Sequence, residues 1–159
     1  MTKTSLETMA SEFLAQKRIA VAGVSADRHR SAAAAIYRRL KGAGHDVFGI
    51  NPNLETFDGD PCYPVVAAIP GGVDGVVIVT RPEVTEDIVQ QCAKADVRRV
   101  WMHESSARTS SVSDRAIALC REAGIRAIPG GCPMMFGAHV DFGHRCLRWM
   151  LKLPAGRFA

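Results

Sequence analysis

The sequence predicts an α/β protein of three layers, in which a five-stranded, mainly parallel sheet lies between two layers of helices. Short apolar runs alternate along the chain with longer segments whose apolar residues have helical spacing. Glycine, proline or asparagine follows most of these runs, as expected where buried strands end. The 159 residues are 47% hydrophobic and 23% charged, which is typical of one globular domain. Alternating strands and helices imply right-handed βαβ units, and therefore a Rossmann-like fold.

The first expected element is an N-terminal helix. Thr4 can cap it, because Glu7 follows three residues later in the pattern of a capping box. The helix ends before Lys17. The residues expected on its apolar face are Leu6, Met9, Phe13 and Leu14.

A strand, a helix and a second strand follow. Residues 19–22 form an apolar run that stops at Gly23, the pattern of a strand buried on both faces of a parallel sheet. Residues 32–41 are rich in helix formers, and the glycines after them are C-terminal stops. Residues 47–50 are the second strand, which ends because the proline after it cannot extend a central ladder.

The same alternation continues toward the C-terminal part of the chain. The remaining expected elements are, in order, a helical piece at 65–68, a strand at 76–79, a helix at 84–95, a strand at 99–102, a helix at 111–123 and a strand at 125–128. The strands then number five. We therefore expect one domain over 1–159, with a core at about 6–135 and a C-terminal helical extension at 138–153.

Charge and hydropathy exclude several classes of partner. The formal net charge is +4, but basic and acidic residues are interspersed, so we expect a small anionic ligand rather than a nucleic acid. No apolar run approaches the ~20 residues that a membrane span requires, so we expect no membrane partner. The N-terminus lacks the apolar region of a secretory signal, which predicts a cytoplasmic protein.

The cysteines and histidines indicate neither a disulfide framework nor a metal site. The cysteines are odd in number and include no C-x-x-C pair, which fits reduced thiols. They are Cys62, Cys92, Cys120, Cys132 and Cys146. His139, Asp141 and His144 have no third well-spaced ligand, so we expect no metal there.

Ligands of an open parallel sheet bind beyond the carboxyl ends of its strands, so the loops at those ends are the informative ones. The expected loops are 23–31, 51–53, 80–82, 103–104 and 130–132. The first fits the G-x-G-x-x-G fingerprint only in part, because Ser25 and Arg28 replace its second and third glycines. Hydroxyl groups of Ser25 and Ser31, a helix N-terminus after them and the charge of Arg30 would still favour a phosphate.

The second loop bears on which nucleotide is bound. NAD sites usually carry an acidic residue there for the ribose hydroxyls, whereas this chain has Asn51-Pro52-Asn53. Asparagine amides can donate to a ribose phosphate that a carboxylate would repel. This pattern favours a nucleotide with a phosphorylated ribose, and it fits coenzyme A (CoA) and NADP equally well.

Several motifs in order resemble the CoA-binding domain family, small stand-alone bacterial proteins similar to the N-terminal domain of the succinyl-CoA synthetase alpha subunit. They are Ile19-Ala-Val-Ala-Gly-Val-Ser with Arg30-Ser31, Asn51-Pro-Asn, Gly59-Asp-Pro-Cys-Tyr-Pro64, Ile69-Pro70, Arg81-Pro82 and Val100-Trp101. The resemblance implies a site for the nucleotide part of CoA. The implied contacts are Gly23, Val24, Ser25, Arg28, Arg30, Ser31, Asn51, Pro52, Asn53, Thr80, Arg81, Pro82, Trp101 and Glu104.

The resemblance implies that the chain binds CoA or an acyl-CoA through its phosphorylated ADP moiety, without catalysis of its own. Two alternatives are an NADP-linked oxidoreductase and a redox-sensing partner subunit that uses Cys132. The chain departs from the family's Arg-Pro-Ser at Arg28-His29-Arg30-Ser31. Family members also tend to close with a cysteine that is followed by an acidic residue and a histidine. Here Cys132 is followed by residues 133–136, which include neither. An apolar face on residues 138–153 could pack on the domain or on a second copy in a homodimer.

Overall fold

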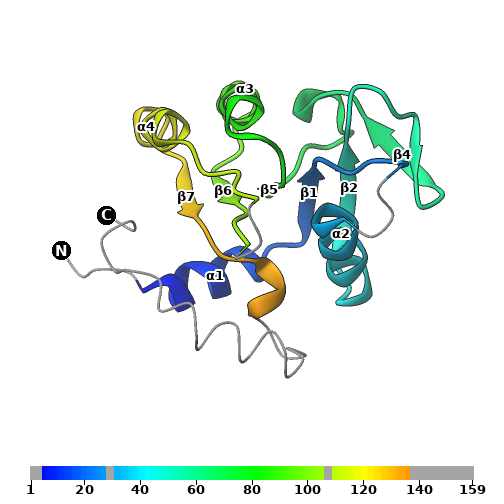
Figure 1. Cartoon of the computed structure of the whole chain (residues 1–159), viewed down its shortest axis with the longest axis horizontal. Helices are drawn as coiled ribbons and strands as arrows, with labels where there is room; N and C mark the ends of the chain where they lie inside the picture. Colours follow the sequence, from blue (N-terminus) through cyan, green and yellow to red (C-terminus); the bar gives the residue numbers. More distant parts are fainter. Residues whose placement is uncertain (1–4, 28–30, 106–108, 137–159) are drawn as a thin grey trace.

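The computed structural model describes residues 5–27, 31–105 and 109–136. Its centre is a mixed, mostly parallel sheet of seven strands in the order β3-β4-β2-β1-β5-β6-β7 (Figure 1). The strands are β1 (Arg18–Ala22), β2 (Asp46–Ile50), β3 (Thr56–Phe57), β4 (Asp60–Tyr63), β5 (Gly75–Ile78), β6 (Arg99–Met102) and β7 (Arg126–Pro129). The predicted α/β, Rossmann-like fold is therefore confirmed.

The predicted number of five strands is wrong. The additional strands β3 and β4 form an antiparallel hairpin, and β4 extends the sheet by pairing parallel to β2. Asp58 and Gly59 form the turn, with φ of 50° and 82°. An Asp-Gly pair with positive φ at both residues is a strong hairpin signal, so the sequence did contain an indication of these strands.

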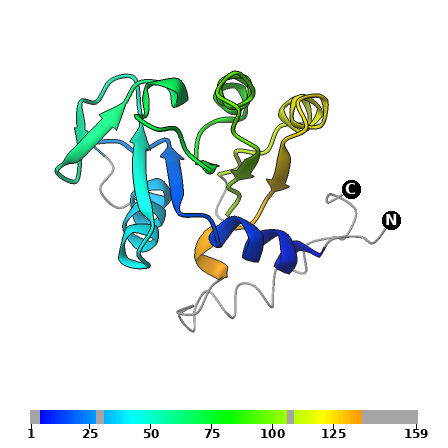
Figure 2. The ribbon, with the colours of Figure 1, turned by 180° about the vertical axis from the view of Figure 1, so that it is seen from behind.

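Helices cover both faces of the sheet (Figures 1 and 2). They are α1 (Leu6–Leu14), α2 (Ala32–Gly42), α3 (Pro82–Lys94) and α4 (Asp114–Glu122), with short 3-10 helices η1 (Val66–Ala68) and η2 (Pro133–Met135). Buried residues of α1, α2 and η2 pack on one face, and those of α3, α4 and η1 on the other. Ser5, rather than Thr4, caps α1, because its hydroxyl oxygen accepts a hydrogen bond from the backbone N–H of Thr8 at 3.2 Å.

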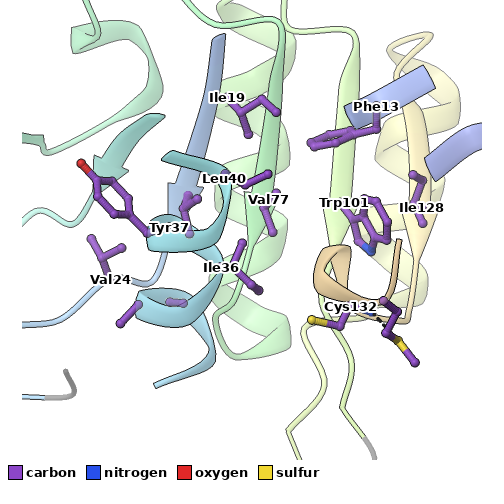
Figure 3. Close-up of a cluster of buried hydrophobic side chains, with 14 of the residues drawn as sticks. Phe13, Ile19, Val24, Ile36, Tyr37, Leu40, Val77, Trp101, Ile128 and Cys132 are labelled. Atoms are coloured by element: carbon purple, nitrogen blue, oxygen red, sulfur yellow. Dashed lines mark hydrogen bonds between the residues drawn. The ribbon is translucent and has the colours of Figure 1, made fainter. Parts of the chain in front are cut away.

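Three aromatic side chains pack together on the face of the sheet that α1 covers. The rings of Phe13 and Trp101 meet edge to face, with centroids 5.5 Å apart, and the ring centroid of Phe136 lies 5.6 Å from that of the same indole. Figure 3 shows Phe13, Trp101 and Ile128 packed together. This cluster connects α1 to the C-terminal part of the sheet.

Some sequence predictions lie outside the described residues. These are the roles of Arg28 and Arg30, the histidines at 139 and 144, Cys146 and the helical extension 138–153. Over the described ranges, no helix is long and apolar enough to cross a membrane. Within the same ranges, no group of three or more potential ligands is arranged to hold a metal ion.

Candidate functional site

A crevice of about 920 Å³ opens at the carboxyl edge of the sheet, where β1 lies between β2 and β5. The strand order reverses at this point, which is where open α/β sheets bind ligands. The lining residues come from the loops after β1, β5 and β6 and from the first turn of α2. They are Gly23, Asp27, Ser31, Ala32, Ala33, Val79, Thr80, Arg81, Pro82, His103, Thr109, Ser110 and Ser111.

Gly23 fits the floor of this crevice because it lacks a side chain. Its φ is +103°, and a Cβ atom built on it would lie 2.1 Å from the carbonyl oxygen of Val79. Its backbone N–H donates to the carbonyl oxygen of Ile50 at 3.2 Å. The first loop can therefore pass close to the ends of β2 and β5 only with glycine at this position.

The N-terminus of α2 faces the crevice. The hydroxyl oxygen of Ser31 caps the helix by accepting from the backbone N–H of Ala34 at 3.2 Å. Ala32 and Ala33, in the first turn, line the crevice with small side chains. Free N–H groups and the helix dipole favour an anion at such a position.

A second helix begins at the same crevice. Arg81 is the N-terminal capping residue of α3, Pro82 is its first residue, and both line the crevice with Thr80. The backbone N–H of Thr80 donates to the hydroxyl oxygen of Ser111 at 3.0 Å, which joins the loop after β5 to the segment after β6. The predicted residues Gly23, Ser31 and 80–82 are thus brought together.

The side chain of Asn51 forms two hydrogen bonds within the protein. The side-chain amide of Asn51 donates to the carbonyl oxygen of Val24 at 2.7 Å, and its side-chain oxygen accepts from the backbone N–H of Asn53 at 2.8 Å. Asn51 therefore holds the first two loops together, and these two bonds leave one of its amide hydrogens unused, although Asn51 itself is outside the crevice lining. The side chain of Val24 is buried in the core, and Pro52 and Asn53 are exposed and outside the crevice lining.

Trp101 does not reach the crevice. Its side chain is 0% exposed, and its indole N–H donates to the carbonyl oxygen of Gly130 at 3.1 Å. Two aromatic neighbours fill the space around it, so its role is to pack the core. Glu104 lies just past the end of β6, half-buried and outside the crevice lining, with its backbone N–H bonded to the carbonyl oxygen of Gly131.

The sequence interpretation missed His103 and the serines at 110 and 111. His103 lines the crevice although only 2% of its surface is exposed. Burial lowers its pKa, and the nearby charge of Glu104 opposes this with a smaller effect. Its position directly after a strand was the signal that could have identified it, since the loop 103–104 was expected at the carboxyl edge.

Cys132, the candidate redox residue, lies in the core beside η2. It is 6% exposed, and burial raises its pKa to about 11, against a small opposing effect of a backbone hydrogen bond. Since the thiolate is the reactive form, only about 0.1% of such a thiol would be ionised at pH 8. The geometry favours a structural thiol.

We therefore expect Cys132 to resist thiol reagents in the native protein. The test uses the Cys146→Ser variant at pH 8 and an aromatic disulfide reagent. Labelling of Cys132 in the native protein should be at least about a hundredfold slower than in the protein unfolded by urea. The other described cysteines, Cys62, Cys92 and Cys120, are buried too. Rapid labelling of one thiol in the native protein that is absent from the Cys132→Ser variant would contradict this expectation. It would support the redox alternative.

The fold and the crevice define a class: a Rossmann-like domain with a crevice at the switch point of its sheet. Residues 17–138 match the CoA binding domain family. The chain belongs to this family.

Individual relatives extend the comparison. A hypothetical protein from Pyrococcus horikoshii OT3 is similar at 26% identity with a TM-score of 0.73, over 90% of this chain and 92% of that one. A dinucleotide-forming acetyl-coenzyme A synthetase 1 from Ca. Korarchaeum cryptofilum matches at 26% identity and a TM-score of 0.58, over 69% of this chain and 25% of that one. An ADP-forming acetate-CoA ligase I from Archaeoglobus fulgidus is 23% identical over 110 residues, 66% of this chain.

This chain spans only 16% of the length of the curated ligase. The resemblance to a succinyl-CoA synthetase-like enzyme is confirmed at the level of its CoA-binding region. The three relatives described above come from archaea, and the expected bacterial affinity is not confirmed.

Proposed function

We propose that this protein binds CoA or an acyl-CoA in the crevice, through the phosphorylated ADP moiety, and acts as a binding module. The observation that carries the proposal is the position of the N-terminus of α2, whose first turn lines a crevice of about 920 Å³. The pyrophosphate would lie there, against free backbone N–H groups. The volume is at the upper end of the range for small-molecule sites, roughly 300–1,000 Å³, as a ligand of this length requires.

Membership of the CoA binding domain family supports CoA over other nucleotides. The asparagine loop supports a phosphorylated ribose, since residues 51–53 contain no carboxylate and Asn51 keeps one amide hydrogen. The adenosine end would then lie near Asn51, with Arg81 at the rim of the crevice. We propose no catalytic step.

Calorimetric titration of the full chain with CoA and with NADP tests this proposal. We expect CoA to bind with a micromolar Kd and NADP to bind at least about tenfold more weakly, a difference of about 1.4 kcal/mol. Both ligands carry a ribose phosphate, so the comparison separates the family-specific ligand from the general effect of charge. NADP binding as tight as CoA would favour the oxidoreductase alternative.

A further inference from the structure

His103 is a buried polar side chain that faces the crevice without a partner. It is 2% exposed and lines the crevice, yet its ring nitrogens form no hydrogen bond with any residue that the structure describes. Among the described residues, the fully buried side-chain nitrogen without a hydrogen-bond partner is Nε of Arg99, so the ring nitrogens of His103 keep contact with the open space of the crevice. A polar group of the bound ligand would supply the missing partner.

The backbone around His103 is held firmly. Its N–H donates to the carbonyl oxygen of Ile78 at 2.9 Å, and its carbonyl oxygen accepts from the N–H of Ser111 at 2.8 Å. The hydroxyl oxygen of Ser111, itself only 3% exposed, accepts from the N–H of Thr80. That bond leaves the hydroxyl hydrogen of Ser111 available to donate into the crevice.

The charge state of this end of the crevice favours an uncharged ligand group. Burial keeps His103 neutral at pH 7, because it lowers the pKa of the imidazole, so the ring offers one N–H donor and one acceptor. Among the described residues, the charged groups at the crevice are Asp27 and Arg81, which are exposed parts of its lining, and Glu104 is adjacent to His103 in the chain. A neutral imidazole beside a serine hydroxyl suits a carbonyl oxygen better than a phosphate.

The strand order places His103 at the far end of the ligand from the adenosine. Along the carboxyl edge the order is β2-β1-β5-β6, and neighbouring strands lie about 4.8 Å apart. The loop after β6 is therefore about 14 Å from the loop after β2 and about 10 Å from the loop after β1. A CoA molecule with its phosphates at α2 would direct its pantetheine arm, which ends in a thiol or thioester, toward β6.

We propose that His103 is a specificity-determining residue whose ring N–H donates to the thioester carbonyl oxygen of an acyl-CoA, with the Ser111 hydroxyl as a second donor. The inference rests on the proposed CoA function. Free CoA has no carbonyl at this position, so the site should distinguish the acylated from the free cofactor.

Three ligands test this inference by calorimetry: acetyl-CoA, free CoA and S-ethyl-CoA. S-ethyl-CoA is a thioether that has the two carbons of the acetyl group but no carbonyl oxygen. Wild type should bind acetyl-CoA about fivefold more tightly than S-ethyl-CoA, the size of one to two net hydrogen bonds. His103→Leu should reduce this ratio to about one, and His103→Gln, which retains an N–H donor, should restore part of it.

His45→Gln is the matched control, because His45 bonds to the carbonyl oxygen of Gln16 on the opposite edge of the sheet and should leave the ratio unchanged. Imidazole ¹⁵N shifts of the wild-type protein give a second readout that does not depend on His103→Leu being folded. The His103 signal, assigned by its loss in His103→Gln, should move with acetyl-CoA and not with S-ethyl-CoA.

Two results would overturn the inference about His103 and leave CoA binding intact. The first is equal affinity of wild type for acetyl-CoA and S-ethyl-CoA, and the second is an unchanged ratio of these affinities in a folded His103→Leu protein. Should His103→Leu fail to fold, an unmoved His103 ring signal on adding acetyl-CoA would overturn it in the same way. Failure of wild type to bind any of the three ligands would overturn the proposed function itself.

Discussion

Replacing Gly23 with alanine is expected to lower the free energy of unfolding by about 3 kcal/mol or more. Two independent costs combine at this position. A φ of +103° is unfavourable for any residue with a side chain, and the new Cβ would lie 2.1 Å from the carbonyl oxygen of Val79. That oxygen belongs to the backbone just beyond β5, so it cannot rotate away as a side chain could. Urea unfolding measures the change.

Two other glycines separate these costs. Gly44 has a φ of +93°, and a Cβ added there would meet no atom within 4 Å, so Gly44→Ala should cost about 1–2 kcal/mol from backbone conformation alone. Gly42 ends α2 with open space around it, so Gly42→Ala should be neutral or stabilising. A Gly23→Ala protein no less stable than Gly44→Ala would show that the first loop does not depend on close contact with β5.

Ala32→Glu is expected to weaken CoA binding by at least about tenfold relative to Ala32→Gln. Ala32 lines the crevice in the first turn of α2, where the ligand phosphates are proposed to lie. A carboxylate about 5 Å from a phosphate would cost about 3 kcal/mol at an effective dielectric constant of about 20, before screening by salt. Glutamine has the same size without the charge, so the pair isolates electrostatic repulsion.

The stability of the Ala32→Glu protein provides the control for folding. A negative charge near a helix N-terminus interacts favourably with the helix dipole, so its unfolding free energy should equal or exceed that of Ala32→Gln. Calorimetry with CoA and urea unfolding would be run on both proteins. Equal CoA affinity of the two variants would place the phosphates away from α2.

The strands and helices of the sheet core could be predicted because their periodicity is local. The apolar runs at 19–22 and 76–79 became β1 and β5, and the helix predicted at 32–41 is α2, within one residue. The hairpin of β3 and β4 was missed because each strand is too short to show an alternating pattern. Its Asp58-Gly59 turn was its one clear indication in the sequence.

The sequence predicted the crevice residues only where the order and direction of the strands alone determine their positions. Gly23, Ser31 and residues 80–82 follow strands, and parallel strands bring their carboxyl ends to one edge. Trp101 and His103 differ by two positions, yet the first lies within β6 under covering side chains and the second lies beyond its end at the crevice. The sequence does not reveal how far along a strand the covering helices extend.

The side-chain hydrogen bonds of Asn51 could not be predicted from the local sequence either. Its amide meets the carbonyl oxygen of Val24, 27 positions earlier, and this contact exists only when β1 and β2 pair in register. A residue type typical of a phosphate contact therefore serves in part as a link between two loops. The same link places the first loop beside the proposed ribose position.

Binding of CoA in the crevice through its phosphorylated ADP moiety is the central claim. The ratio of the Kd values for dephospho-CoA and CoA, measured by calorimetry at one salt concentration, tests it most directly. The two ligands differ only in the 3′-phosphate, which we place near Asn51 and opposite no carboxylate in residues 51–53. We predict that dephospho-CoA binds at least about tenfold more weakly, as expected for a lost charge-assisted contact. Equal or tighter binding of dephospho-CoA would contradict this claim.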